Sequence, residues 1–464
     1  MIAVATIVLI LYIGFIGFVL KKTFEGDAYY LLLYILFTLP FYTTFQLVIF
    51  KGFDLSFLVD LFKYSKDFVF FTGFFVFIFG KKESFIQYKW QPTLLDKLFL
   101  GFMTLTLIYT LIPLGEAPFL SKIIYAKNTF LIGIVYFLGR NTTIDKQRWR
   151  FIVKVLIYLS VGSFLFALTE TILGMHLQNI LDYGRFNLLT NDIFPSGNYG
   201  LSWTFERPGP IKRFGSFFAD PLEFASFLLL GLSAVLFKIY NSKLSINRLN
   251  HFVFFLLIII GIYLSYSRSV IISVFLMLLI SLFLIKKYRL LIKLIFGLLF
   301  ISLITYYNSN IETKYFIMDT LTFQNSSSLG HLVKWIQGIL SIIDNPLGSG
   351  LGTSGNSLSV DNEISIGGEN QFIIIGVQLG LIGLLNYTGL IFYSIRNSYK
   401  LYNLENDRQF KYLPFIVCCL KFALIFPLLT SNAEIYTFLS LCGWFLVGLN
   451  ERRYNNLKPN PVLN

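Results

Sequence analysis

Thirteen long apolar runs separate short charged segments along this chain of 464 residues. Most of the runs contain 16 to 24 residues, the length that an α-helix needs to cross about 30 Å of hydrocarbon. Some runs are short and two nearly fuse, so we expect about 12–13 transmembrane helices. The sequence therefore predicts an all-α, polytopic transmembrane helical protein with a single integral membrane domain over residues 1–464. The runs are 2–20, 29–50, 67–80, 98–114, 128–139, 151–174, 217–238, 251–266, 269–285, 290–307, 371–394, 412–430 and 434–449.

The composition excludes a water-soluble globular protein. Hydrophobic residues make up 55% of the chain and charged residues only 14%, whereas soluble domains carry about 25% charged residues. The net charge of +13 does not indicate nucleic-acid binding, because much of the excess lies in short segments between apolar runs, where it orients helices and meets anionic lipid headgroups. We therefore expect membrane lipids, and no nucleic acid, among the partners.

Two long polar segments interrupt the apolar pattern, at residues 175–216 and 308–370. They divide the chain into N-terminal helices over 1–174, core helices over 217–307 and C-terminal helices over 371–464. Both segments are dotted with glycine and hold most of the groups that could do chemistry in water. We therefore expect them to form two larger loops that carry the functional site.

The distribution of basic residues predicts which side of the membrane these loops face. With the N terminus outside, the short inside segments hold 24 of the 38 Lys and Arg residues, and the outside segments hold 12. Because Lys and Arg are retained on the cytoplasmic side of short loops, this bias places both polar loops on the extracytoplasmic face.

The first polar loop ends with two arginines and a lysine, Arg207, Lys212 and Arg213, shortly before an apolar run. Arginine binds phosphate in a bidentate manner and a helix N-terminus adds amide donors, so this segment is a candidate oxyanion site. A basic loop that touches lipid headgroups is the alternative. Asp220 stands just before Pro221, and is interpreted either as part of the site or as an N-terminal helix cap.

Arg268 lies in an abrupt polar turn between two apolar runs. A cation at this depth is costly unless a partner meets it, and a phosphate group is a suitable partner. The alternative is an arginine that snorkels to the interface.

The second polar loop contains a predicted amphipathic helix, opened by His331. His331 is either a base or, as is common at a helix start, a capping or packing residue. The glycines of 348–352 let the chain pass close to a sugar or form a turn. The apolar positions of this helix recur at three and four residues, and are Leu332, Ile336, Ile339, Leu340 and Ile343.

Glu369 and Asn370 stand where the chain re-enters the membrane after the second loop. Desolvation there could raise the pKa of Glu369, so that this carboxylate serves as a general base. A partner for the helix dipole in the first turn is the alternative. No Gly-rich nucleotide-binding motif is present, and the cysteines lie within the last two apolar runs, so we expect no metal, nucleotide or other cofactor.

Four motifs occur in order along the second half of the chain: RFGSFFADPLEFASF (213–227), SYSRS (265–269), GHLVKWIQGILSIIDNPLGSGLG (330–352) and ENQFIIIGVQLGLIGLL (369–385). Together they resemble the O-antigen ligase and polymerase superfamily, which comprises Wzy-type polysaccharide polymerases and WaaL-type ligases. The resemblance covers about residues 213–385, and the first six apolar runs match only as generic membrane spans.

The resemblance implies a multi-pass glycosyltransferase of the bacterial inner (plasma) membrane that takes a glycan from an undecaprenyl-diphosphate carrier on the periplasmic face. By position, Arg213 and Arg268 match the arginines that are thought to hold the carrier's diphosphate. Two positions depart from the family. His331 stands where the family often has arginine, and Glu369-Asn370 stands where ligases usually have a His-Asn pair, which favours a polymerase.

We therefore expect a metal- and nucleotide-independent polymerase of lipid-linked repeat units, with a chain-length regulator as a candidate partner protein. A ligase that moves the glycan onto a lipid A core or a protein is the first alternative, and a flippase or other transporter is the second. The expected catalytic residues are Glu369 and, as second choice, His331. The expected substrate-binding residues are Arg207, Arg213, Arg268, Asp220 and Asn370.

Overall fold

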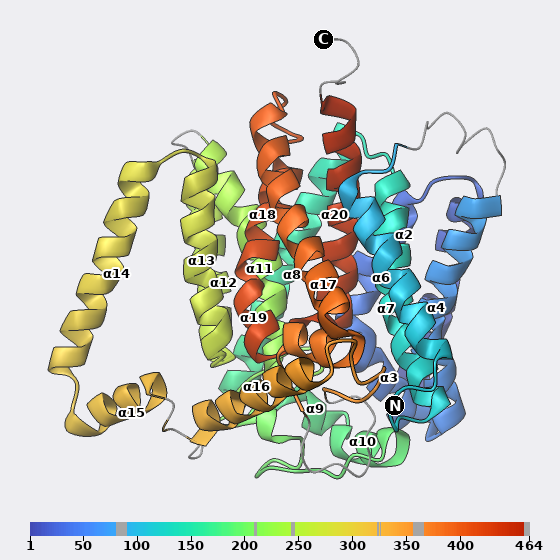
Figure 1. Cartoon of the computed structure of the whole chain (residues 1–464), viewed down its shortest axis with the longest axis horizontal. Helices are drawn as coiled ribbons and strands as arrows, with labels where there is room; N and C mark the ends of the chain where they lie inside the picture. The colour runs from blue at the N-terminus through green and yellow to red at the C-terminus, as the bar shows by residue number, and fades with distance from the viewer. Residues whose placement is uncertain are drawn as a thin grey trace.

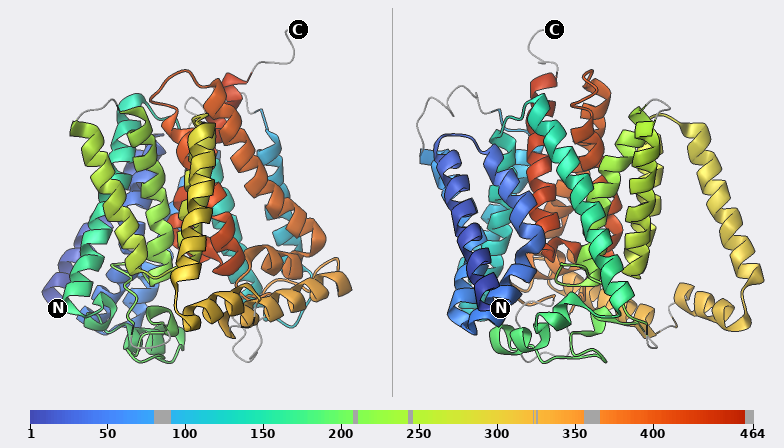
Figure 2. Two further views of the ribbon diagram at one scale, coloured as in Figure 1. Left: turned by 90° about the vertical axis from the view of Figure 1, so that its left-hand side faces the viewer. Right: turned by 180° about the vertical axis from the view of Figure 1, so that it is seen from behind.

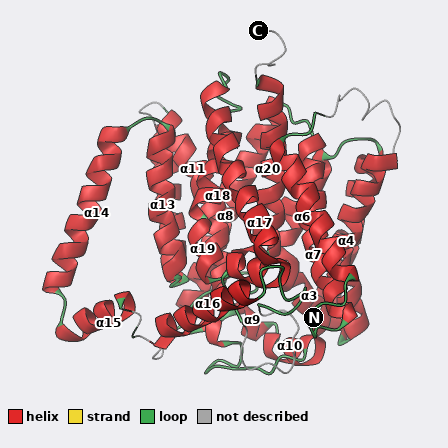
Figure 3. Cartoon of the chain, viewed as in Figure 1, coloured by secondary structure: helices red, strands yellow, loops and turns green. Residues whose placement is uncertain are grey.

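The computed structural model describes residues 1–79, 91–207, 211–242, 246–322, 324, 326–355 and 366–458. These residues form a bundle of helices joined by turns and loops (Figure 1 and Figure 3). Across the described ranges no strand occurs, and extended pairing is limited to one bridge between Glu206 and Lys212. The predicted all-α class is confirmed. Four lysines of the charge count lie outside the described residues, namely Lys81, Lys82, Lys89 and Lys243.

The helices follow one another in this order: α1 (Ile2–Phe24), α2 (Tyr29–Thr38), η1 (Leu39–Phe41), α3 (Tyr42–Phe53), α4 (Ser56–Phe79), α6 (Leu94–Leu111), α7 (Phe119–Asn141), α8 (Lys146–Leu173), α9 (Leu177–Ile180), α10 (Tyr183–Asn191), η2 (Trp203–Phe205), α11 (Pro221–Asn241), α12 (Ile246–Leu264), α13 (Arg268–Leu284), α14 (Tyr288–Asn308), α15 (Ile311–Leu321), α16 (Ser326–Asp344), α17 (Gln371–Leu404), α18 (Tyr412–Ala423), α19 (Ile425–Thr430), η3 (Ala433–Ile435) and α20 (Thr437–Leu457).

Each predicted apolar run overlaps one of these helices or a consecutive pair. In the described part of the chain, nine helical segments are long and apolar enough to cross a membrane, counting α2 with α3 and α18 with α19 as single spans. Helices α12 and α13 are apolar but shorter, and α4 and α20 are long but more polar. The polytopic membrane class is therefore confirmed, and the difference from the expected 12–13 helices lies in these four elements.

The two ends of the bundle differ. One end, which we call the polar-loop end, holds the N terminus with α9, α10, α15 and α16, and the other, the C-terminal end, holds the C terminus (Figure 1 and Figure 2). Both polar segments thus lie at the same end as the N terminus. This agrees with the even number of predicted spans that precedes each of them. Which end faces the cytoplasm stays a prediction from the distribution of charge.

The centre of the bundle packs through small residues, most closely between α7 and α20. A Cβ atom at Gly139 would collide with the backbone of Phe445, and one at Gly448 would collide with the backbone of Tyr136. Glycines let helix backbones approach closely in membranes, where helices associate by packing and hydrogen bonding.

Helix α14 lies at the edge of the molecule beside α13 and has no buried residue (Figure 1). It leads through α15 to α16, which runs across the polar-loop end (Figure 2). Helix α16 contains the predicted amphipathic segment. Most of its apolar stripe is exposed rather than packed on the protein, since Leu332 is half-buried while Ile336, Ile339, Leu340 and Ile343 are all more than two-fifths accessible. An exposed apolar stripe on a helix across the end of a membrane bundle is typical of an interfacial helix.

Candidate functional site

The end of the first polar loop forms a short two-stranded ribbon that carries Arg207 and Arg213. The Arg207 amide donates to the carbonyl of Ile211 (3.1 Å), and the Arg213 amide donates to the carbonyl of Phe205 (2.9 Å). Residues 208–210 lie outside the described residues. These backbone hydrogen bonds thus hold the two arginines on one ribbon. Their spacing along the chain does not by itself require this arrangement.

This ribbon packs against the turn between α12 and α13. Arg213 donates from Nε to the carbonyl of Ser265 (2.9 Å), and the guanidinium of Arg207 lies 5.4 Å from the ring centre of Tyr266. Arg268 is the first residue of α13, directly after this turn. The structure therefore places Arg207 and Arg213 against the turn that leads into Arg268, and the charges of Arg207 and Arg268 both act on Arg213.

Burial lowers the pKa of the Arg213 guanidinium, and the charges of Arg207 and Arg268 lower it further. Asp220 and Tyr436 oppose this shift. Three like charges that act on one another at a partly buried site favour an anion as the missing partner.

Asp220 is the N-cap of α11, and the capping alternative is correct for its side chain. Its Oδ1 accepts the amides of Leu222 (2.7 Å) and Glu223 (2.8 Å). The prediction that this helix start offers amide donors to an oxyanion is wrong, because the cap already occupies them. Helix α13 has no side-chain cap at Ser267, so its first turn, which begins at Arg268, is the better candidate for amide donors.

Glu170 and Gln178 brace the chain just after Arg213. The two carboxylate oxygens of Glu170 accept the amides of Leu177 and Ser216, both at 2.8 Å. Gln178 donates from Nε2 to the carbonyls of Ser216 (2.9 Å) and Phe218 (2.7 Å). Glu170, near the end of α8, therefore has a structural role, because its carboxylate joins two segments of the first polar loop.

A first-loop histidine that the sequence analysis passed over, His176, is fully buried among Tyr199, Phe205 and Phe214. Burial and the nearby charge of Lys212 lower the pKa of its imidazole to about 4. His176 is therefore neutral at ordinary pH and packs the ribbon from behind.

Glu369 stands one residue before Asn370, the N-cap of α17. The Asn370 side chain accepts the amides of Phe372 (3.1 Å) and Ile373 (3.2 Å), which gives this predicted substrate-binding residue a capping role. Glu369 is outside the first turn of α17, so the helix-dipole alternative is wrong. Burial raises the pKa of the Glu369 carboxyl, Asp220 raises it further, and Lys334 opposes the rise. Asp220 and Glu369, which belong to different loops, thus act on each other.

His331 lies in the second turn of α16, which begins at Ser326, so it does not open the helix as predicted. Burial lowers the pKa of its imidazole, and the charges of Lys334 and Arg268 lower it further. Gly338 lets α16 lie close to the segment around Glu369. A Cβ atom at Gly338 would collide with the side chain of Ile373 and would lie 3.0 Å from Cα of Gly367. Helix α16 thus brings His331 and Lys334 between Arg268 and Glu369.

Tyr436, just before α20, completes the cluster. Burial raises the pKa of its phenol well above the usual value, Asp220, Glu223 and Glu369 raise it further, and Arg213 lowers it. The phenol is therefore a stable hydrogen-bond donor beside these carboxylates. The candidate site, as we use the term below, consists of Arg207, Arg213, Asp220, Arg268, His331, Lys334, Glu369 and Tyr436.

Glu434 supports the segment that carries Tyr436. It accepts hydrogen bonds from Tyr387 (3.0 Å), Ser440 (2.8 Å) and the Trp444 indole. Neither Lys334 nor Tyr436 was a predicted site residue. Lys334 lies directly before Trp335 within a predicted motif, which is the signal that could have identified it, whereas Tyr436 lies within the last predicted apolar run, 434–449.

The glycines of 348–352 lie against a break in α17 and not against an open site. Gly380 is non-helical (φ 69°), and the freed carbonyls of Val377 and Gln378 accept the amides of Ser349 (2.7 Å) and Gly350 (3.1 Å). Of the two alternatives, a close approach to a sugar or a turn, the structure shows a turn, whose close partner is the backbone of α17. Among the residues that the structure describes, no group of three or more His, Cys, Asp or Glu could hold a metal ion.

Comparison with known protein families gives one match. Residues 253–388 match a family model described as O-Antigen ligase. This part of the chain is similar to the O-antigen ligase/polymerase superfamily. The matched range runs from α12 into α17, so it includes Arg268, His331 and Glu369 but neither the first-loop ribbon nor Tyr436. No curated protein matches the chain. The match suggests ligase- or polymerase-type activity.

Proposed function

We propose that this protein polymerises oligosaccharide repeat units carried on undecaprenyl diphosphate, at the outer face of the bacterial inner membrane. The observation that carries the proposal is that Asp220 acts electrostatically both on Arg213, beside Arg207 and Arg268, and on the raised-pKa carboxyl group of Glu369, in a chain whose residues 253–388 match this family. The charge bias, which puts the polar-loop end outside, supports the location.

The arginines suit the leaving group. In the transfer, the bond between the anomeric carbon and the diphosphate oxygen breaks, and the diphosphate departs with its negative charge. Arg207, Arg213 and Arg268 would stabilise that charge, and Arg213 is already oriented by its bond to Ser265. Positive charge that develops on the sugar ring is stabilised by nearby carboxylates, of which Asp220 is one.

Glu369 suits the proton transfer. A hydroxyl of the acceptor sugar attacks the anomeric carbon, a new glycosidic bond forms, and the hydroxyl proton passes to the Glu369 carboxylate. A carboxyl group with a raised pKa is a stronger base near neutral pH than an ordinary one. Lys334 would keep a useful fraction of it ionised. His331, which is neutral by its lowered pKa, is the second candidate for the base.

A polymerase is favoured over a ligase because Glu369 occupies the place of the histidine that ligases usually have. The ligase, which would transfer the finished glycan to a lipid A core or a protein, remains the second candidate on the strength of the family match itself. The transporter alternative has no such support.

An assay with purified protein and undecaprenyl-diphosphate repeat units tests the proposal. We expect a ladder of chain lengths to appear without added metal or nucleotide. Transfer only to an added second acceptor would replace polymerase by ligase. No transfer of either kind, by protein that is monodisperse and folded, would reject the enzyme.

A further inference from the structure

A hollow of about 340 Å³ opens at the C-terminal end of the bundle, far from the candidate site. It lies where α8, α11, α12 and α18 come together, and its wall includes Arg150, Lys238, His251, Arg408 and Tyr412. Nothing in the proposed polymerase reaction uses these residues.

The hollow gathers positive charge without a carboxylate in its wall. Arg150 and Lys154 both act electrostatically on Lys238. Within the described ranges, the lining residues include no Asp or Glu. Asp407 stands next to Arg408 in the chain, but its carboxylate pairs with Lys146 (2.6 Å) and accepts the amide of Gln409 (2.9 Å).

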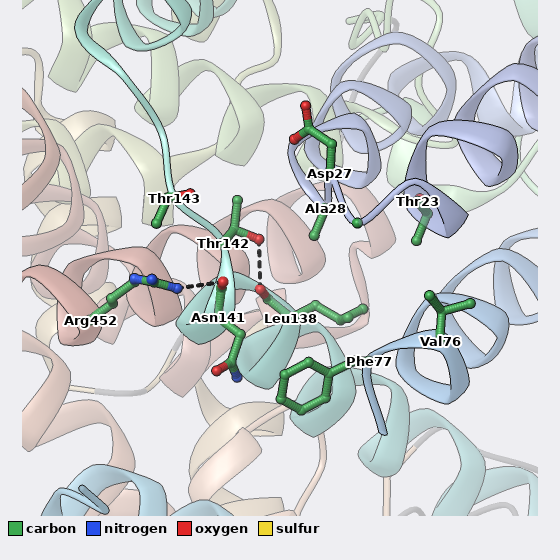
Figure 4. Close-up of a pocket in the computed structure, with 12 residues that line it drawn as sticks. Thr23, Asp27, Ala28, Val76, Phe77, Leu138, Asn141, Thr142, Thr143 and Arg452 are labelled. Carbon is green, nitrogen blue, oxygen red and sulfur yellow. Dashed lines mark hydrogen bonds between the residues drawn. The ribbon is translucent and has the colours of Figure 1, made fainter. Parts of the chain in front are cut away.

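A second hollow at the same end shows what a balanced pocket looks like. Figure 4 shows it between the α1–α2 turn, α4, α7 and α20, with Asp27 and Arg452 in its wall. Arg452 donates to the carbonyl of Asn141, and Asp27 pairs with Arg148 (2.8 Å). Its wall therefore contains a carboxylate, Asp27, whereas the described lining of the hollow at Lys238 contains none.

Two features make the basic hollow a built site. Arg408 is held in place because it donates to both the side-chain oxygen (3.1 Å) and the carbonyl of Asn241. The side-chain oxygen of Gln409 is buried and has no hydrogen-bond partner among the described residues. A buried acceptor without a donor is costly, so a hydroxyl on a bound molecule would relieve it.

The position of the hollow along the helix axes indicates which kind of ligand it can meet. Helix α11 ends at Asn241, and α18 begins at Tyr412, so the hollow lies where membrane-crossing helices end. Phe237 and Tyr412 give it an aromatic floor, with ring centres 4.0 Å apart. Basic pockets between helices at this level are suited to lipid headgroups.

We propose that this hollow binds the headgroup of an anionic phospholipid that carries a free hydroxyl, of the phosphatidylglycerol type. The phosphate lies against Arg150 and Lys238, and the headgroup hydroxyl donates to the side-chain oxygen of Gln409. The site is independent of the reaction at the polar-loop end.

Native mass spectrometry of the detergent-purified protein tests the proposal, with phosphatidylglycerol and phosphatidylethanolamine of the same acyl chains as probes. We expect tighter binding of phosphatidylglycerol, and about fivefold weaker binding for each cation removed in Arg150→Gln and in the Arg150→Gln/Lys238→Gln double variant. Gln409→Leu should reduce the preference for phosphatidylglycerol over phosphatidylethanolamine, whose headgroup has no hydroxyl.

The matched control is Lys21→Gln/Arg289→Gln, which removes two exposed cations from the same end of the bundle. Equal loss of lipid in the control and pocket variants would overturn the proposal. Inorganic phosphate at millimolar concentration should not displace the lipid, and displacement would assign the site to a free anion instead. Arg150 is exposed, so its single substitution keeps the test valid if the double variant does not fold.

Discussion

The first-loop ribbon and the turn that carries Glu369 meet at one site but are held in different ways. Backbone pairing and the Glu170 carboxylate fix the ribbon with hydrogen bonds of 2.8 to 3.1 Å. The Glu369 turn rests on close packing against α16 at Gly338, and the charges of Lys334 and Asp220 act in opposite directions on the pKa of the Glu369 carboxyl. The contrast is what the proposed chemistry needs. A diphosphate is best held by donors fixed beforehand, whereas a base is adjusted through its electrostatic surroundings.

Glu369→Gln should have the largest effect on this comparison, because it removes the proposed base and leaves the arginines intact. We expect a fall of about 10²- to 10⁴-fold in the polymerisation rate. His331→Gln is the matched variant and should cost less than about tenfold. The measurement is the initial rate of ladder growth. If His331→Gln lowers the rate more than Glu369→Gln does, His331 and not Glu369 is the general base.

Arg268→Ala should come next, because it breaks the arginine group and leaves the base in place. Loss of one donor that stabilises a developing negative charge costs about 10²- to 10³-fold in rate. Arg268→Lys, which keeps the charge but not the bidentate geometry, should retain part of the activity. Rates with saturating lipid-linked substrate measure the effect. Full activity of the alanine variant would exclude Arg268 from the site.

Gly338→Ala should have a smaller effect, by pushing α16 away from the Glu369 turn. Its Cβ would collide with Ile373, so we expect a roughly 10- to 100-fold slower reaction through misplacement of Lys334 and Glu369. Gly330→Ala in the same helix is the control, since a Cβ atom at Gly330 meets nothing within 4 Å. Equal rates of the two variants would contradict the role of this packing contact.

Much of the architecture follows from the sequence, because membrane spans need only length and apolarity. The expectation that Arg213 and Arg268 share a site followed from the ordered motifs, and Arg207 was added as part of the same basic segment as Arg213. The roles of Asp220 and Asn370 as caps were readable from their place before a helix start, although the sequence left the first open and assigned the second to substrate.

The remainder of the site could not be derived from local pattern. Tyr436 comes to the carboxylates through the tertiary fold, and Lys334 faces Glu369 only because α16 lies across the end of the bundle. The interfacial position of α16 is another example. An apolar stripe is expected both for a helix packed against the protein and for a helix at the membrane interface, so the pattern alone does not distinguish them. Such features depend on contacts between segments far apart in the chain.

The electrostatic link between the two loops is the most direct test of a single site, and the pH dependence of the rate measures it. Glu369 works as a base when ionised, so activity should fall as the pH drops through its raised pKa. Lys334→Gln removes the charge that opposes the rise, so the acid limb should move to higher pH. Asp220→Asn, which can still cap α11, removes a charge that raises the pKa, so the limb should move to lower pH. Opposite shifts in the two variants are the predicted result, and an acid limb that neither substitution moves would contradict the account.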